Sequence, residues 1–233
     1  ARLGNETRVE ILQHLGTAGE PLQFSELYER TDVDDSGQFN YHLTKLVGQF
    51  VSKTEDGYTL SRMGRRVVEA VLSGAVTDTP ALERTQIDEP CEYCGAPIDV
   101  AWEEGSVRTF CTECAGQYGR AYDGGSTSID APEGYLGRLP LPPAGVRDRS
   151  PTELLGVARL AGTLEVYALS EGVCPRCSAT VEQSVSICED HTTGETLCES
   201  CQGRYATSVE FTCTNCIYKA GGDGGLALLT ADP

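Results

Sequence analysis

Residues 91–114, CEYCGAPIDVAWEEGSVRTFCTEC, place one Cys-x-x-Cys pair at each end of a short segment. The intervening PIDVAWEEGSVRTF is predicted to form a β-hairpin that brings the two pairs together. Four thiolates at this spacing are the ligand set of a tetrahedral zinc site. Two redox-active pairs are the alternative, but the surrounding βαβ pattern of thioredoxin-like chemistry is missing. We therefore expect a zinc ribbon, with Cys91, Cys94, Cys111 and Cys114 as its ligands.

Four further ligand pairs follow near the end of the chain. Three are Cys-x-x-Cys pairs, and the fourth, CEDH, joins Cys188 to His191. His191 gives a partner to the odd one of the eleven cysteines, and the chain then has enough ligands for three four-coordinate zinc ions. These C-terminal ligands are Cys174, Cys177, Cys188, His191, Cys198, Cys201, Cys213 and Cys216.

An internal repeat suggests how the C-terminal pairs combine. CTECAGQY in the first ribbon matches CESCQGRY at residues 198–205. By this alignment the pairs that begin at Cys174 and Cys198 share one zinc ion. The pairs that begin at Cys188 and Cys213 would share another in an interleaved module, and the other two pairings stay open.

The zinc sites are expected to be structural. Four thiolate-rich ligands leave no open position for an activated water. A zinc deaminase would need an H-x-E motif upstream of Pro90-Cys91, and neither His14 nor His42 supplies it. No H-E-x-x-H motif, phosphate-binding loop or nucleophile elbow is present, so we predict no enzyme.

Residues 31–46, TDVDDSGQFNYHLTKL, have the pattern of a turn followed by a helix. Asp35 and Gln38 have the spacing of a capping box, which predicts that the helix begins there. Apolar residues then recur at i, i+4, i+7 and i+11, which is the spacing of one buried helical stripe. The stripe consists of Phe39, Leu43, Leu46 and Phe50.

The elements around this helix suggest a winged helix. Two helical segments precede it, and Asp56-Gly57 joins two alternating segments after it, which is a strong hairpin signal. A last helix, RMGRRVVEAVLSG, completes the order helix, helix, helix, hairpin, helix within residues 1–75.

In a winged helix the third helix enters the major groove of DNA. Gln and Asn can contact adenine, and lysine and arginine can contact phosphate. His42 lies nearer the buried stripe and is expected to pack or to form a hydrogen bond. The predicted DNA-binding residues are Ser36, Gln38, Asn40, Tyr41, Thr44, Lys45, Lys53 and Arg62.

The segments LGNETRVEILQHL, FSELYERT, QFNYHLTKLVGQFV and DGYTLSRMGRRVVEAV resemble the ArsR-type winged helix-turn-helix. More narrowly, they resemble haloarchaeal regulators that carry cysteine-rich segments behind such a domain. The resemblance covers residues 1–75 and implies a transcriptional regulator that binds promoter DNA, typically as a dimer. Residues 1–75 contain no cysteine, which puts metal-triggered release by this domain in doubt.

The charge of the chain fits this resemblance. The net charge is −17, and arginine greatly outnumbers lysine among the 18 basic residues. Such a chain suits a cytosol of molar salt, where the Debye length falls to about 3 Å and self-repulsion costs little. An acidic protein that avoids nucleic acid is the alternative. Residues 1–75 are the least acidic part of the chain. Without a signal peptide or a long apolar run, we expect a cytoplasmic protein.

The predicted fold class is α+β. It consists of a winged helix-turn-helix at 1–75, a connector at 76–89 and a first zinc ribbon with an irregular Gly/Pro-rich segment at 90–149. A helix follows at 150–171, and a two-zinc ribbon module at 172–233. The helix has a capping box at Ser150 and Glu153 with Pro151 at its first position. Its apolar face must pack on another domain or on a second subunit, and consists of Leu154, Leu155, Val157, Leu160, Ala161 and Leu164.

The leading hypothesis is a DNA-binding transcriptional regulator with structural or partner-contacting zinc ribbons. Its partners would be double-stranded DNA, a second copy of the chain and a protein of the transcription machinery, with no membrane. Two alternatives remain: a protein-interaction adaptor that does not bind DNA, and a zinc or redox sensor that uses labile ribbon cysteines.

Overall fold

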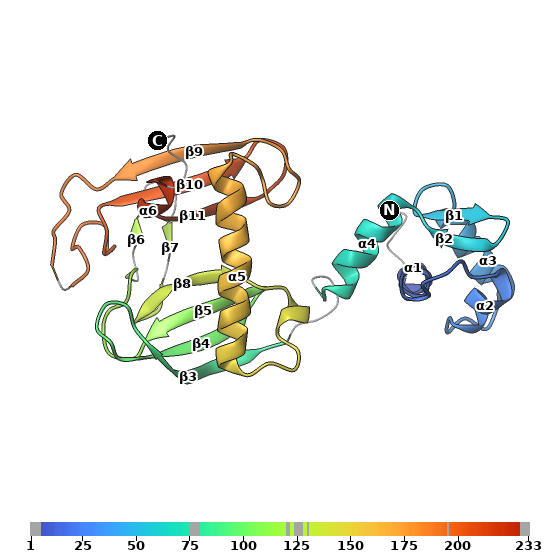
Figure 1. Cartoon of the computed structure of the whole chain (residues 1–233), viewed down its shortest axis with the longest axis horizontal. Coiled ribbons are helices and arrows are strands. Elements are labelled where there is room, and N and C mark those ends of the chain that lie inside the picture. The colour runs from blue at the N-terminus through green and yellow to red at the C-terminus, as the bar shows by residue number, and fades with distance from the viewer. Residues whose placement is uncertain are drawn as a thin grey trace. The chain divides into compact units, whose positions relative to one another are not determined.

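The computed structural model describes residues 6–74, 80–119, 122–123, 128–129, 131–194 and 196–228. The chain folds into two compact units, Ala1–Thr79 (unit 1) and Pro80–Pro233 (unit 2) (Figure 1). Helices dominate unit 1 and small antiparallel sheets dominate unit 2, so the protein belongs to the predicted α+β class. Among the described residues, no helix is both long enough and apolar enough to cross a membrane.

The described part of unit 1 has four helices and one β-hairpin around a single core. The predicted stripe of the third helix is confirmed, because all four of its residues are buried. Phe39 also packs edge-on against Phe24 of the second helix, with the ring centroids 5.2 Å apart. The elements are α1 (Glu6–Thr17), α2 (Phe24–Glu29), α3 (Ser36–Leu46), β1 (Val51–Thr54), β2 (Gly57–Leu60) and α4 (Arg62–Leu72).

Helix α3 begins at the predicted residue, but the predicted capping box between Asp35 and Gln38 does not form. Asp35 is the N-cap, and its Oδ1 accepts a hydrogen bond from the backbone N–H of Gly37 at 2.7 Å. The carboxylate also lies at the positive end of the helix dipole, which stabilises it. Gln38 is exposed and does not complete a box, so its amide stays at the surface.

The β1–β2 hairpin turns at Asp56-Gly57, as the sequence predicts. Gly57 has φ of +127°, and a Cβ there would lie 2.4 Å from the carbonyl oxygen of Leu22. This close approach allows Leu22 and Tyr58 to exchange two backbone hydrogen bonds of 3.0 and 2.8 Å. The hairpin is thereby tied to the segment that leads into α2.

Helix α4 crosses the chain immediately after α3 at very short range. Ser61 caps α4 by accepting a hydrogen bond from the N–H of Gly64, and its hydroxyl donates to the carbonyl of Gln49 at 2.6 Å. A Cβ on Gly64 would lie 2.0 Å from the carbonyl oxygen of Phe50. Only glycine fits this contact without a backbone shift.

Unit 2 contains a four-stranded antiparallel sheet in the order β3-β4-β5-β8. Its centre is the predicted hairpin, and both of its outer strands correct the sequence analysis. β3 occupies most of the predicted connector at 76–89, of which residues 76–79 are outside the described part. β8 lies in the segment predicted to be irregular. Each outer strand pairs with an edge of the hairpin that would otherwise leave backbone groups unpaired. The bounds are β3 (Leu82–Pro90), β4 (Pro97–Glu103), β5 (Ser106–Cys111) and β8 (Tyr135–Pro140).

Helix α5 (Pro151–Ser170) begins with the predicted capping box between Ser150 and Glu153. Its first half packs on the four-stranded sheet through Leu154 and Leu155, and Leu169 near its end packs on a second sheet. Figure 1 shows α5 running across both sheets. Of the predicted apolar face, Leu154 and Leu155 pack within unit 2, whereas Leu160 and Leu164 are exposed in the single chain and stay available to a second subunit.

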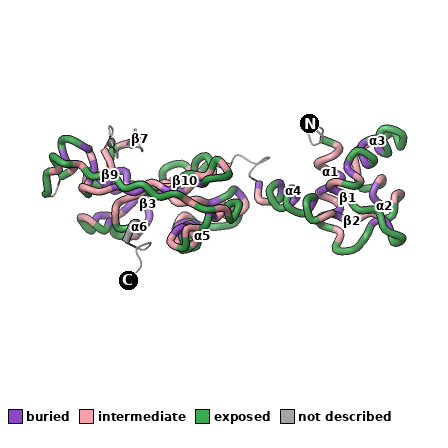
Figure 2. Tube along the Cα trace, turned by 90° about the horizontal axis from the view of Figure 1, so that it is seen from above, coloured by how far each residue is buried: buried purple, intermediate pink, exposed green. Residues whose placement is uncertain are grey.

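The second sheet of unit 2 has the order β11-β10-β9 and is antiparallel throughout. Val209 and Phe211 of its central strand are buried, whereas the edge strand β9 is largely exposed (Figure 2). The bounds are β9 (Val181–Ile187), β10 (Thr207–Cys213) and β11 (Lys219–Asp223). The short elements are β6 (Tyr122–Asp123), β7 (Ser128–Ile129), η1 (Pro143–Gly145) and α6 (Gly225–Leu228).

The contact at Gly64 predicts a stability effect. Replacing Gly64 by Ala forces α4 away from the Phe50 carbonyl, and we expect it to destabilise unit 1 by at least about 2 kcal/mol. Replacing the neighbouring exposed Arg65 by Ala is the control, with an expected effect within about 0.5 kcal/mol. Unfolding of the full chain in molar KCl, followed by helical circular dichroism, measures both. Equal effects of the two substitutions would contradict the close approach.

Candidate metal centres

Four cysteines meet at one end of the four-stranded sheet. Cys91 directly follows β3, and Cys111 is the last residue of β5, opposite Ile98 in the β4–β5 register. The hairpin therefore brings the two Cys-x-x-Cys pairs together, and their four Sγ atoms lie within 4.8 Å of one another. This first tetrad consists of Cys91, Cys94, Cys111 and Cys114.

The sulfur spacings of the first tetrad fit a tetrahedral ion. Cys91 Sγ lies 3.8 Å from Cys114 Sγ, and Cys94 Sγ lies 3.4 Å from Cys111 Sγ. A disulfide requires about 2.05 Å, so these are free thiols. Ligands at a zinc–sulfur distance of about 2.3 Å stand about 3.8 Å apart at the corners of a tetrahedron. The donor set and its spacing therefore fit zinc.

Backbone N–H groups point at the ligand sulfurs. The N–H groups of Cys114 and Glu113 donate to Cys111 Sγ at 3.2 and 3.4 Å. Burial raises the pKa of the Cys111 thiol, but these donors and the neighbouring thiols outweigh burial and bring the pKa to about 7. Because the thiolate is the form that binds metal, the turn prepares Cys111 as a ligand.

The second tetrad repeats this arrangement at one end of the β9–β10 hairpin. Cys213 ends β10 and lies opposite the first residue of β9. Cys174 Sγ lies 3.7 Å from Cys216 Sγ, and Cys177 Sγ lies 3.5 Å from Cys213 Sγ. The backbone N–H groups of Cys216 and of the residue before it lower the pKa of the Cys213 thiol to about 6. Geometry and donors again fit zinc.

The third tetrad lies in the connection between β9 and β10, residues 188–206. His191 Nδ1 lies 3.4 Å from Cys201 Sγ, close to the separation of about 3.6 Å for nitrogen and sulfur ligands of one tetrahedral zinc ion. The backbone N–H groups of Cys201 and Thr192 lower the pKa of the Cys198 thiol to about 5. The ligands of this tetrad are Cys188, His191, Cys198 and Cys201.

The pairing of the C-terminal ligands differs from the one that the repeat predicts. The pair beginning at Cys174 shares its site with the pair beginning at Cys213, and the pair beginning at Cys188 shares its site with the pair beginning at Cys198. The interleaved arrangement is wrong because β9 and β10 are antiparallel. Residues before β9 and after β10 meet at one end of the hairpin, and the connection at the other end closes its own site.

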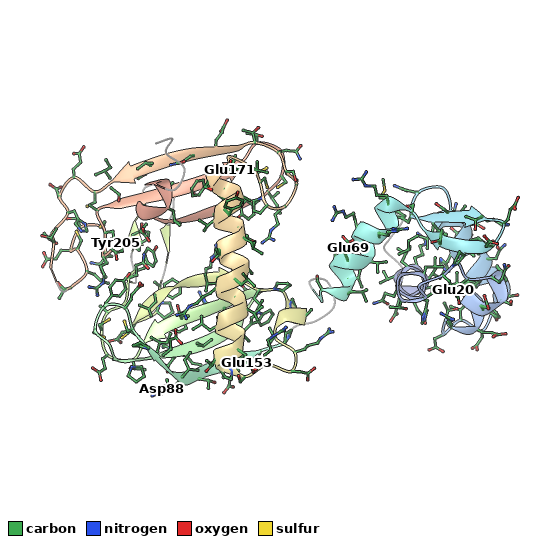
Figure 3. The ribbon with its side chains drawn as sticks, in the orientation of Figure 1. Glu20, Glu69, Asp88, Glu153, Glu171 and Tyr205 are labelled. Carbon is green, nitrogen blue, oxygen red and sulfur yellow. The ribbon has the colours of Figure 1, made fainter. Side chains whose placement is uncertain are left out.

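The repeat has a different structural meaning. CTECAGQY and CESCQGRY lie against each other, with the N–H of Gly119 donating to the carbonyl of Gln202 at 2.7 Å and the N–H of Arg204 donating to that of Gln117 at 3.0 Å. The first and third tetrads are thereby joined. Figure 3 labels Tyr205 in this connection, and the ring of Tyr205 lies 6.4 Å from that of Tyr93.

Arg204 is a residue of this junction that sequence reasoning misses. Its Nε donates to the carbonyl of Gly116 at 3.0 Å, and its guanidinium lies 4.2 Å from the ring centroid of Tyr93. Both contacts cross from the third tetrad to the first. The repeat was the available signal, because Arg204 lies within its second copy, CESCQGRY.

Each tetrad supplies four protein ligands, so a zinc ion held there would have no position left for water or substrate. Such an ion supplies folding free energy, about 10–16 kcal/mol of apparent binding energy per site in small zinc domains. The three tetrads thus contain all twelve predicted ligands and fit three zinc ions.

The predicted DNA-binding residues lie in unit 1, and all of them are exposed. Six project from α3, Lys53 lies in β1, and Arg62 is the first residue of α4. The Lys45 ammonium stands 5.3 Å from the ring centroid of Tyr41, so these two side chains form one surface patch. The Lys53 ammonium stands 5.5 Å from the ring of Tyr58 in the hairpin.

His42 packs on the buried side of α3, as predicted. It is only 6 % exposed, and its Nδ1 accepts a hydrogen bond from Arg8 Nε at 3.3 Å. Burial, with Arg8 as a second cause, lowers the pKa of His42. The neutral ring therefore holds α1 to α3 and leaves the exposed side of α3 to other residues.

The ligand pairing predicts a pattern of zinc contents. Under a chelator that strips three-ligand sites, Cys174→Ala should lower the content from three zinc ions per chain to two. Adding Cys213→Ala should cost no further zinc, because both residues serve one site. Adding Cys198→Ala instead should lower the content to one. Elemental analysis of the purified chains measures the zinc content. If adding Cys198→Ala costs no further zinc whereas adding Cys213→Ala does, the pairing suggested by the repeat is the correct one.

Metal removal is also expected to loosen the core next to the first tetrad. Trp102, the only tryptophan, is buried in the same cluster as Cys91 and Cys111, and its Nε1 donates to the carbonyl of Leu141 at 2.8 Å. Cys91→Ala should therefore shift the tryptophan emission to longer wavelength. Cys177→Ala, in the second tetrad, is the control and should leave the emission unchanged. A shift of equal size in both would show that the sites do not act locally.

The family comparisons divide the chain as the structure does. A family model described as "Domain of unknown function (DUF7351)" matches residues 88–233, and the chain belongs to that family. A second model, described as "Domain of unknown function (DUF7347)", matches residues 1–71. No curated protein and no solved structure matches the chain.

Proposed function

We propose that the protein is a DNA-binding transcriptional regulator whose unit 1 is a winged helix-turn-helix of the ArsR type. Three helices, a β-hairpin and a fourth helix follow one another in the order that this domain requires. In this proposal α3 is the recognition helix, and the β1–β2 hairpin is the wing.

The observation that carries the proposal is the division of α3 into two faces. Its apolar stripe is buried, while the six predicted contact residues on the helix are exposed. A surface helix of ordinary composition would carry charges of both signs on such a face. This face carries amides, hydroxyls, a phenol and a single cation, which are the groups that contact base edges and phosphates.

The exposed residues divide into two chemical roles. Gln38 and Asn40 can each form two hydrogen bonds with adenine in the major groove. Lys45 on α3, Lys53 on the hairpin and Arg62 at the start of α4 would contact phosphates and set the position of the helix.

The charge of the chain bears on how it would bind. The net charge of −17 opposes approach to DNA at low salt, and salt screens that repulsion. Salt equally weakens attraction between lysine or arginine and phosphate. A cytoplasm of molar salt would therefore favour a recognition helix that relies on base-edge hydrogen bonds and packing, as the polar face of α3 suggests.

Unit 2 would have a non-catalytic role in this proposal. Its three closed ligand sets suit structural zinc. Its sheets and α5 would then form a rigid body for contact with a second copy or with a protein of the transcription machinery.

DNA binding is testable in molar KCl. Duplexes selected from a random pool by the wild-type chain serve as probes, and mobility shifts give the affinity. Tyr41→Ala combined with Lys45→Ala should weaken binding at least about tenfold. Arg30→Ala, which removes an exposed cation at the end of α2, is the control and should have little effect.

Specificity and salt dependence separate the two roles. Gln38→Ala should relax the selected sequence at one position, whereas Lys53→Ala should weaken binding to all sequences and reduce the salt slope by about 1. The proposal fails if the wild-type chain selects no sequence, or if the Tyr41 and Lys45 variant binds as the wild type does.

A further inference from the structure

Helix α5 is apolar on two opposite sides. One side packs into unit 2 through Leu154, Leu155 and Leu169. On the other side Leu160 and Leu164 are 61 and 64 % exposed. An apolar stripe on a helix is normally buried, so the second side calls for a covering partner.

The exposed apolar residues form a continuous stripe. Leu160, Leu164 and Tyr167 follow one another at i, i+4 and i+7, and Tyr167 is 69 % exposed. Gly156 lies one turn before Leu160, with open space where a Cβ would stand. We call these four residues the outer stripe; it lies between Glu153 and Glu171, which mark the two ends of α5 in Figure 3.

We propose that the outer stripe binds the same stripe of a second copy of this chain, with the two α5 helices antiparallel. A two-fold axis at the level of Gly162, on the outer side of the helix, sets Leu160 of each copy against Leu164 of the other. The same axis sets Tyr167, the largest residue of the stripe, against Gly156, the smallest. The stripe is thus complementary to itself in size, as a two-fold interface requires.

The area of the stripe suits a second copy, and its lack of charge limits repulsion there. The chain has a net charge of −17, so two copies repel each other over most of their surfaces. The outer stripe contains no charged residue, and the repulsion between Glu153 of one copy and Glu171 of the other, which the same axis brings near each other, is screened in molar salt. Three large apolar side chains with the neighbouring parts of four helical turns bury roughly 500 Å² per copy, and the total of about 1,000 Å² is the lower bound for a specific interface.

Unit 1 is a poorer occupant of this surface. Its large apolar residues that are exposed in the described ranges are Tyr41, Met63 and Leu72. Tyr41 lies on α3, and Met63 and Leu72 are nine residues apart on α4, which places them on opposite sides of that helix. None of them continues a stripe that could match the four residues of α5.

The first experiment measures the mass of the full chain in molar KCl at tens of micromolar, by light scattering after gel filtration. The wild type should have twice the chain mass of 25.0 kDa. Leu160→Gln combined with Leu164→Gln should raise the dimer Kd by about a hundredfold or more. A bound zinc content of three and an unchanged circular dichroism spectrum show that the variant is folded.

A matched control uses the exposed apolar residues of the edge strand β9. Val185→Gln combined with Ile187→Gln should leave the dimer intact. The proposal is overturned if the wild type is monomeric, or if the β9 variant dissociates while the α5 variant does not.

A cross-link identifies the occupant. With Tyr167 replaced by the photo-reactive p-benzoylphenylalanine, the cross-linked peptide should contain Gly156 of a differently isotope-labelled copy. A cross-link to residues 6–74 of the same chain would place unit 1 on the stripe and would also overturn the proposal. Neither experiment uses DNA. Both can therefore be interpreted even if the protein proves not to bind DNA.

Discussion

The coordination of three four-ligand sites is the constraint on which unit 2 depends. Among the described residues, the buried core of its second sheet consists of Leu169, Val209 and Phe211, too little to hold three strands by burial alone. In the first sheet, Cys91 and Cys111 are themselves part of the core. A metal ion at one end of each sheet, with a third in the β9–β10 connection, would contribute more than the few kcal/mol by which small domains are usually stable.

Other contacts within unit 2 connect the three ligand sites to one another. The segments at Gln117–Gly119 and Gln202–Arg204 join the first tetrad to the third through backbone hydrogen bonds. Helix α5 joins the two sheets from the other side, and Glu165 on it accepts a hydrogen bond from Tyr218 beside the second tetrad at 3.0 Å. The three sites therefore belong to one body, and α5 can present its outer stripe in a fixed orientation.

Unit 1 is built on a different principle, because its described hydrophobic core contains no cysteine. Two glycines, Gly57 and Gly64, allow the backbone contacts that tie the hairpin and α4 to the helices. The neutral His42 with Arg8 fixes the inner side of α3. The exposed face of α3 is polar, and the contacts that position this helix do not depend on metal.

Local pattern in the sequence determined the twelve ligands, the buried stripe of α3, the turn at Asp56-Gly57 and the start of α5 at Pro151, since spacing and capping act within a few residues. Three things were decided only by the tertiary structure. The Gly/Pro-rich segment and the connector became strands because hairpin edges were open to them. Leu160 and Leu164 stayed outside because Leu169 and Leu155 took the positions that face the two sheets. The ligands combine as they do because, in the antiparallel β9–β10 hairpin, the residues before the first strand lie beside the residues after the second, and the connection lies at the opposite end. Spacing along the chain does not reveal this arrangement.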